Sequence, residues 1–88
     1  FRVMVSSEAT PMVAEGRSVF VRHVVDWDKK IYPGQEVLVV DPDGRLLAVG
    51  KALISGMEIG RVIRGVVVKV RSSAGMVFKQ RQTGVGGS

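Results

Sequence analysis

The side chains best suited to chemistry in this sequence are cations placed near an aromatic ring. Arg17, Phe20 and Arg22 lie within six residues of one another, and Lys69 and Arg71 alternate further along the chain. Lysine and arginine neutralise phosphates and release counterions, while an aromatic ring or a guanidinium can stack on an unpaired base. These residue types favour an RNA-binding surface. The alternative is that Phe20 is a core residue and the cations form a solvated face.

The charge distribution supports a polyanionic partner. Residues 1–44 hold five Lys/Arg and seven Asp/Glu, a net of −2, whereas residues 45–88 hold eight Lys/Arg and one acid, a net of +7. Such asymmetry indicates a nucleic acid or an anionic membrane surface as partner. The alternative is a basic protein that its charge keeps in solution.

Other chemistry has weaker support. His23, Asp26 and Asp28 are close enough in sequence to be considered as metal ligands, but a fourth ligand is missing and a strand would place His23 and Asp28 on opposite faces. No nucleophile with an adjacent base is recognisable. The chain has no cysteine, so disulfides and cysteine-based zinc sites are excluded. We therefore expect no catalytic residue, no metal and no cofactor.

The elements that must position these residues begin with a strand at residues 2–5. A helix over residues 8–15 should follow, capped by Ser6 or Ser7 and ended by Gly16. Residues 18–25 then alternate as a strand, which would place Phe20 and Arg22 on one face. In the loop that follows, Trp27 and Tyr32 are expected to fold back on the core.

A β-hairpin is the strongest local signal in the chain. Its strands are predicted at residues 36–40 and 45–49, joined by Asp41, Pro42, Asp43 and Gly44. Proline presets φ for a type I turn, aspartate can cap that turn with its side chain, and glycine adopts the left-handed conformation that closes it. Because residues 37–40 are all apolar, the first strand is predicted to be covered on both faces.

The second half of the chain predicts one more helix and one more strand. Ser55 and Glu58 form a capping box, so a helix should start there, bury an apolar stripe of Met57, Val62 and Ile63, and end at Gly65. Residues 66–71 form the next strand. We place a domain at residues 1–72, followed at 73–88 by a segment in which 76–80 could form a last strand before a flexible tail. The missing N-terminal methionine suggests a piece of a longer protein. Without a signal segment or an apolar run of about 18 residues, we expect a cytoplasmic location and no membrane contact.

The order of these parts resembles a PUA domain. The resemblance covers roughly residues 3–71 and rests on the glycine-ended helix, the segment PGQEVLVVDPDG at 33–44, the segment LAVGKA at 47–52 and the strand GVVVKVR at 65–71. The segment Gly16-Arg17-Ser18-Val19-Phe20 looks especially like the C-terminal PUA module of archaeal tRNA-guanine transglycosylases.

This resemblance implies a mainly β fold with two short helices, a mixed-strand pseudo-barrel of about six strands. It also implies an RNA surface made by the first helix, the turn and strand after it, and the last strand. The resemblance assigns this surface to Glu15 at the end of the first helix, and to Gly16, Arg17, Ser18, Phe20, Arg22, Lys69 and Arg71.

The leading hypothesis is therefore a non-catalytic RNA-binding module that positions tRNA or another structured RNA for an RNA-modifying catalytic domain in the same chain or complex. The alternative hypothesis is a protein-interaction or scaffolding domain with no direct RNA contact.

Overall fold

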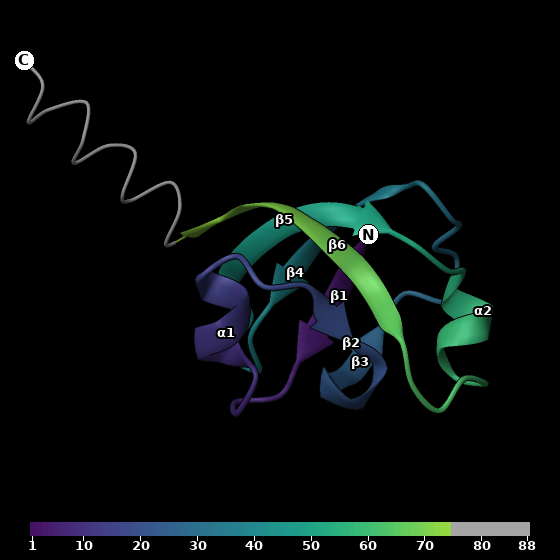
Figure 1. The fold of residues 1–88 in the computed structure, drawn as a ribbon, viewed down its shortest axis with the longest axis horizontal. Helices are drawn as coiled ribbons and strands as arrows, with labels where there is room; N and C mark the ends of the chain where they lie inside the picture. Colours follow the sequence, from purple (N-terminus) through teal and green to yellow (C-terminus); the bar gives the residue numbers. More distant parts are fainter. Residues whose placement is uncertain (75–88) are drawn as a thin grey trace, which may run out of the picture.

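The computed structural model describes residues 1–74, which fold around one mixed sheet (Figure 1). In chain order the elements are β1 (Arg2–Val5), α1 (Thr10–Ala14), β2 (Val19–Phe20), the 3-10 turn η1 (Val21–His23), β3 (Val24–Trp27), β4 (Glu36–Val40), β5 (Leu46–Ala52), α2 (Gly56–Ile59) and β6 (Val66–Ser73). The strand expected at 76–80 and the tail after it lie outside the described residues.

The sheet has six strands in the order β2-β6-β5-β4-β1-β3. The β1–β4 pair is parallel and the other pairs are antiparallel. Its two edge strands, β2 and β3, follow each other in the chain and are joined only by η1, so the sheet curls into a nearly closed barrel. Figure 1 shows α1 and α2 at opposite ends of this barrel. The expected mixed pseudo-barrel with two short helices is confirmed.

The barrel interior is filled by small branched side chains. Every strand except β3 contributes a buried residue to one continuous core, and α1, α2 and the loop before β4 add one buried residue each. β-branched residues fit the pleated wall of a narrow barrel because their side chains are stiff and compact. The fully buried positions include Val3, Val5, Val13, Val19, Val39, Val67 and Val68.

The hairpin forms as the sequence predicts. One carboxylate oxygen of Asp41 accepts hydrogen bonds from the backbone N–H of Asp43 at 2.9 Å and of Arg45 at 2.8 Å. Gly44 has a φ of 86°, the left-handed conformation that closes the turn. The double covering expected for β4 is wrong at Leu38, which is 39% exposed, although Val40, expected on the same face, is buried.

The strand expected over residues 18–25 is divided in the structure. β2 pairs with β6 through only two residues, η1 turns the chain, and β3 then pairs with β1. The segment must change partners at a corner of the barrel, and an alternating pattern alone does not reveal such a corner.

Both helices are shorter than expected. α1 begins at Thr10 and has no side-chain cap; the backbone carbonyl of Ser6 instead accepts from the N–H groups of Ala9 and Thr10. α2 starts at the predicted capping box, where Ser55 accepts from the Glu58 N–H, but it ends at Ile59. The predicted apolar stripe is therefore wrong, since Ile63 lies beyond the helix and is 92% exposed.

The two aromatic residues between η1 and β4, Trp27 at the end of β3 and Tyr32 in the loop, are held differently. Trp27 folds onto α2, where its indole Nε1 donates a hydrogen bond to the carbonyl of Gly56 at 2.6 Å. Tyr32 is 60% exposed, so the expectation that it covers the core is wrong. Trp27 packs against the core at this end, together with the buried Ile31 and Ile59.

Candidate nucleic-acid interface

The turn at Gly16 sets the start of the candidate surface. Gly16 has a φ of 106°, and the N–H of Arg17 donates to the carbonyl of Met12 at 3.1 Å. This left-handed glycine ends α1 and points the chain into β2, as the sequence predicts. Arg17 is exposed and Ser18 is partly exposed at the entrance to that strand.

Pairing between β2 and β6 joins the two halves of the predicted site. Val19 lies opposite Val68, so Ser18 comes beside Lys69 on the neighbouring strand. Both side chains alternate with these buried valines and therefore face outward. The structure thus brings the glycine turn and Lys69 onto one face, although about 50 residues separate them in sequence.

Phe20, Arg22 and His23 form a compact cluster at the end of β2. The guanidinium carbon of Arg22 lies 5.4 Å from the centroid of the Phe20 ring, a cation–π distance. His23 meets the same ring edge-on with centroids 5.8 Å apart, and Arg22 Nε donates to His23 Nε2 at 3.4 Å. Phe20 remains 38% exposed, so it is a surface residue with a fixed orientation and not part of the core. The 3-10 turn, not a strand face, brings Arg22 to Phe20.

A hollow opens beside this cluster. It has a volume of about 260 Å³ and is lined by Phe20, Arg22, Ile63, Arg64 and Gly65. Its apolar walls and two guanidinium groups offer a ring-sized space with cations at the rim. Such a combination suits a base flanked by phosphates.

Sequence reasoning missed Ile63 and Arg64, because both were assigned to a helix. Two signals could have found them. Gly60 weakens the middle of the proposed helix, and Arg64-Gly65 directly precedes the strand that carries Lys69. Gly65 has a φ of 124°, so the chain turns there, and its carbonyl accepts from the N–H of Val21 at 3.0 Å.

Arg71 is set apart from the other predicted residues. It lies five residues after Val66, the β6 partner of Phe20, which corresponds to about 17 Å along a strand. Its Nη1 lies 3.5 Å from a carboxylate oxygen of Glu36, and both side chains are more than half exposed. An ion pair this exposed contributes at most about 1 kcal/mol. The predicted residues therefore form an elongated surface with Arg71 at its far end.

We give the name basic strip to a set of outward-facing residues in β2, η1 and β6 and in the turns that lead into β2 and β6. Within residues 1–74, none of its four cations has a carboxylate within 4 Å. The strip consists of Arg17, Ser18, Phe20, Arg22, Arg64 and Lys69.

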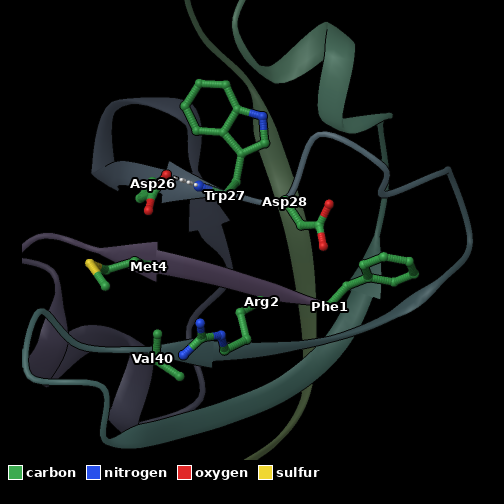
Figure 2. A pocket seen from close by; sticks show the side chains of 7 residues that line it. All are labelled: Phe1, Arg2, Met4, Asp26, Trp27, Asp28 and Val40. Atoms are coloured by element: carbon green, nitrogen blue, oxygen red, sulfur yellow. Dashed lines mark hydrogen bonds between the residues drawn. The ribbon is translucent and has the colours of Figure 1, made fainter.

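A second hollow, of about 360 Å³, is lined by residues of β1, β3 and β4 and by residues next to these strands (Figure 2). β1, which contributes to it, is three strands away from β6 in the sheet order. Its lining carries the carboxylates of Asp26 and Asp28, and Asp26 accepts a hydrogen bond from the Trp27 N–H at 2.9 Å. We call it the acidic pocket; its lining is Phe1, Arg2, Met4, Asp26, Trp27, Asp28 and Val40.

Residues 1–74 lack two structural features. They contain no group of three His, Cys, Asp or Glu side chains placed to hold a metal ion. In this part of the chain, no helix has the length and apolarity needed to cross a membrane.

A small, nearly closed β-barrel with a basic, aromatic strip on two adjacent strands defines the class of module. The chain belongs to the PUA domain family, whose model matches residues 1–73. The resemblance found in the sequence is confirmed.

Named relatives place the chain more closely within that family. The tRNA-guanine(15) transglycosylase of Methanocaldococcus jannaschii is 44% identical over 71 residues, which are 81% of this chain and 11% of that protein. The crystal structure of a hypothetical protein from Pyrococcus horikoshii superposes with a TM-score of 0.79 at 40% identity, covering 83% of this chain and 44% of that one.

A chain of the archaeal box H/ACA sRNP Nop10–Cbf5 complex gives a TM-score of 0.80 at 26% identity, covering 83% of this chain and 24% of that one. This chain therefore corresponds to the PUA part of larger proteins and spans about 11% of the length of the transglycosylase.

Proposed function

We propose that this domain binds structured RNA, with tRNA as the leading candidate, and positions it for an RNA-modifying catalytic domain in the same chain or complex. The observation that carries the proposal is the basic strip, in which four cations without carboxylate partners among residues 1–74 flank a partly exposed phenylalanine. The 44% identity to a tRNA-guanine(15) transglycosylase supports tRNA as the RNA. The domain itself supplies binding and orientation and performs no catalytic step.

Each residue of the strip has a role in this proposal. Arg17, Arg64 and Lys69 neutralise backbone phosphates, and the left-handed Gly16 lets the backbone approach the RNA beside them. Phe20, held by Arg22, offers its ring to an unpaired base, and Ser18 donates to a phosphate or ribose oxygen. Arg71 joins only after it leaves Glu36.

A separate observation supports the alternative role, which is contact with a neighbouring protein domain. The acidic pocket combines the carboxylates of Asp26 and Asp28 with the Arg2 guanidinium and an indole ring, a mixture of charged and aromatic groups that suits a protein partner. We assign this side of the barrel to protein contact, with RNA on the other side.

The test is the salt dependence of binding between residues 1–88 and a tRNA transcript, measured by fluorescence anisotropy. Three or four phosphate contacts predict a slope of about −2 to −4 for log K against log salt. Reversal of Arg17, Arg22 and Arg64 to glutamate should abolish binding. Reversal of Arg2, Lys30 and Arg45, which lie off the strip and change the net charge equally, should leave most of it.

All six side chains are exposed, so both triple variants should keep the wild-type melting temperature. If RNA binding survives the Arg17, Arg22 and Arg64 reversals, the protein-contact hypothesis replaces the RNA-binding one.

A further inference from the structure

A row of charged side chains crosses three neighbouring strands beside the basic strip. Lys51 on β5 lies opposite Glu36 on β4 on one side and opposite Lys69 on β6 on the other. All three side chains are exposed. The row continues the strip across the sheet toward Arg71, which contacts Glu36 from β6.

Two lysines directly opposite each other are an unfavourable pair in an isolated sheet. Opposed residues on antiparallel strands have Cα atoms about 5 Å apart, and like charges in that position destabilise the sheet. Glu36 could offset Lys51, but its carboxylate lies 3.5 Å from Arg71, and no carboxylate within residues 1–74 lies within 4 Å of either ammonium group. The pair therefore presents two positive charges that an external anion would neutralise.

The backbone holds this pair in register. Gly50, next to Lys51, lies so close to β6 that a Cβ atom would collide with the carbonyl oxygen of Lys69. A register shift between Val49 and Gly50 accompanies this close approach. Because residue 50 is a glycine, β5 and β6 can approach this closely, and the contact fixes Lys51 beside Lys69.

We propose that Lys51 and Lys69 together bind one backbone phosphate of the RNA, and that the negative charge of Glu36, which lies opposite Lys51, weakens this binding. The inference rests on the proposed function and adds Lys51, on a strand outside the basic strip, to the RNA-binding surface. When the phosphate is bound, the two ammonium groups lie on either side of its anionic oxygens. Arg71 then becomes free to contact the next phosphate once its pairing with Glu36 is broken.

The experiment measures the dissociation constant of a tRNA transcript with residues 1–88 over a range of KCl concentrations. The variants are Lys51→Gln, Lys69→Gln, the double change, Glu36→Gln, and Lys30→Gln as a control lysine in the loop after β3. Each single change at Lys51 or Lys69 should raise Kd by roughly 3- to 10-fold at 0.1 M salt and make the salt slope shallower by about 1.

The double variant distinguishes a shared phosphate from two independent ones. A shared phosphate predicts a slope change of about 1 in total for the double variant, because the same counterion release is lost only once. Glu36→Gln should lower Kd by roughly 2- to 5-fold, since a competing negative charge is removed. Lys51→Gln should also leave the melting temperature unchanged or higher, because it relieves the like-charge pair.

The outcomes separate the two proposals. If Lys51→Gln binds like Lys30→Gln while Lys69→Gln is weakened, the inference is overturned and the proposed function stands. A double variant whose slope changes by about 2 would also overturn the shared phosphate. If the wild-type chain binds no tRNA, the proposed function fails and this inference fails with it.

Discussion

Phe20 shows how single side chains define the candidate surface. Its ring is held from one side by the Arg22 guanidinium and from another by the edge of His23, yet it keeps 38% of its surface exposed. A phenylalanine in so small a domain is usually buried in the core. A fixed and exposed ring has little conformational entropy left to lose when it stacks on a base.

Phe20→Ala should weaken tRNA binding by about 1–3 kcal/mol, the usual cost of losing one stacked base. Its effect on the free energy of unfolding should be small, because the ring lies outside the core. Tyr32→Ala is the matched control, since Tyr32 is an exposed ring in the loop before β4 and is not a member of the strip. Titration by fluorescence anisotropy measures both; equal weakening by the two changes would remove Phe20 from the interface.

At the scale of elements, the β4–β5 hairpin is the frame that positions charged side chains on both of its neighbours. β5 pairs with β4 on one side and with β6 on the other, so it fixes Lys51 relative to Glu36 and Lys69. The frame depends on the turn at residues 41–44, where Asp41 is nearly buried and its carboxylate accepts two backbone hydrogen bonds.

Asp41→Ala should lower the free energy of unfolding by about 1–3 kcal/mol, because two backbone N–H groups lose a charged acceptor. Asp43→Ala provides a control in the same turn, since the Asp43 side chain accepts no hydrogen bond within residues 1–74. Urea denaturation gives both values. Similar losses from the two changes would mean that the turn does not depend on the Asp41 carboxylate.

Gly50→Ala should destabilise the domain by about 1–3 kcal/mol, because the added methyl group collides with the backbone of β6. Lys51→Ala, one residue along the same strand, has an exposed side chain and should cost much less. Urea midpoints compare the two variants. A Gly50→Ala protein as stable as the wild type would contradict the close approach of β5 and β6.

Local signals predicted the hairpin, the glycine turn at Gly16 and the start of α2, since each depends on a few adjacent residues. The helix end predicted at Gly65 was wrong, because α2 already ends at Ile59. The corner at η1 could not be predicted, because it arises from a change of pairing partner between β6 and β1. The hollow beside Phe20 was missed for a related reason. Ile63 and Arg64 reach it only because α2 ends early and the chain turns back to β6.

The candidate residues also divide into those that the sequence predicted and those whose positions depend on strand pairing. Gly16, Arg17, Ser18, Phe20, Arg22 and Lys69 lie in the turn before β2, in β2, in η1 and in β6, and their contact with RNA remains a prediction. Arg71 lies further along β6 and is paired with Glu36, a contact between residues 35 positions apart that no local pattern reveals. A role for Lys51 was not predicted from the sequence, because the register of strand pairing decides which residues lie opposite it.

At the scale of the whole molecule, the barrel separates two kinds of surface. The basic strip and the Lys51–Lys69 pair lie on β2, β6 and β5, whereas the acidic pocket lies on β1, β3 and β4 (Figures 1 and 2). In the proposed function, the cations of the strip contact RNA, and the acidic pocket contacts a neighbouring protein domain. The net charge of +5 does not reveal this arrangement, in which the strip carries four cations while Asp26 and Asp28 line the acidic pocket.

The most direct test of this account is to map the RNA contact surface by NMR, with ¹⁵N-labelled residues 1–88 titrated with a tRNA transcript. We predict that the backbone amides with the largest shifts and broadening belong to Arg17, Phe20, Arg22, Lys51 and Lys69, while those of Met4, Asp26 and Trp27 change little. The largest changes at the acidic pocket, or no changes at all, would contradict the central claim that the strip on β2 and β6 binds RNA.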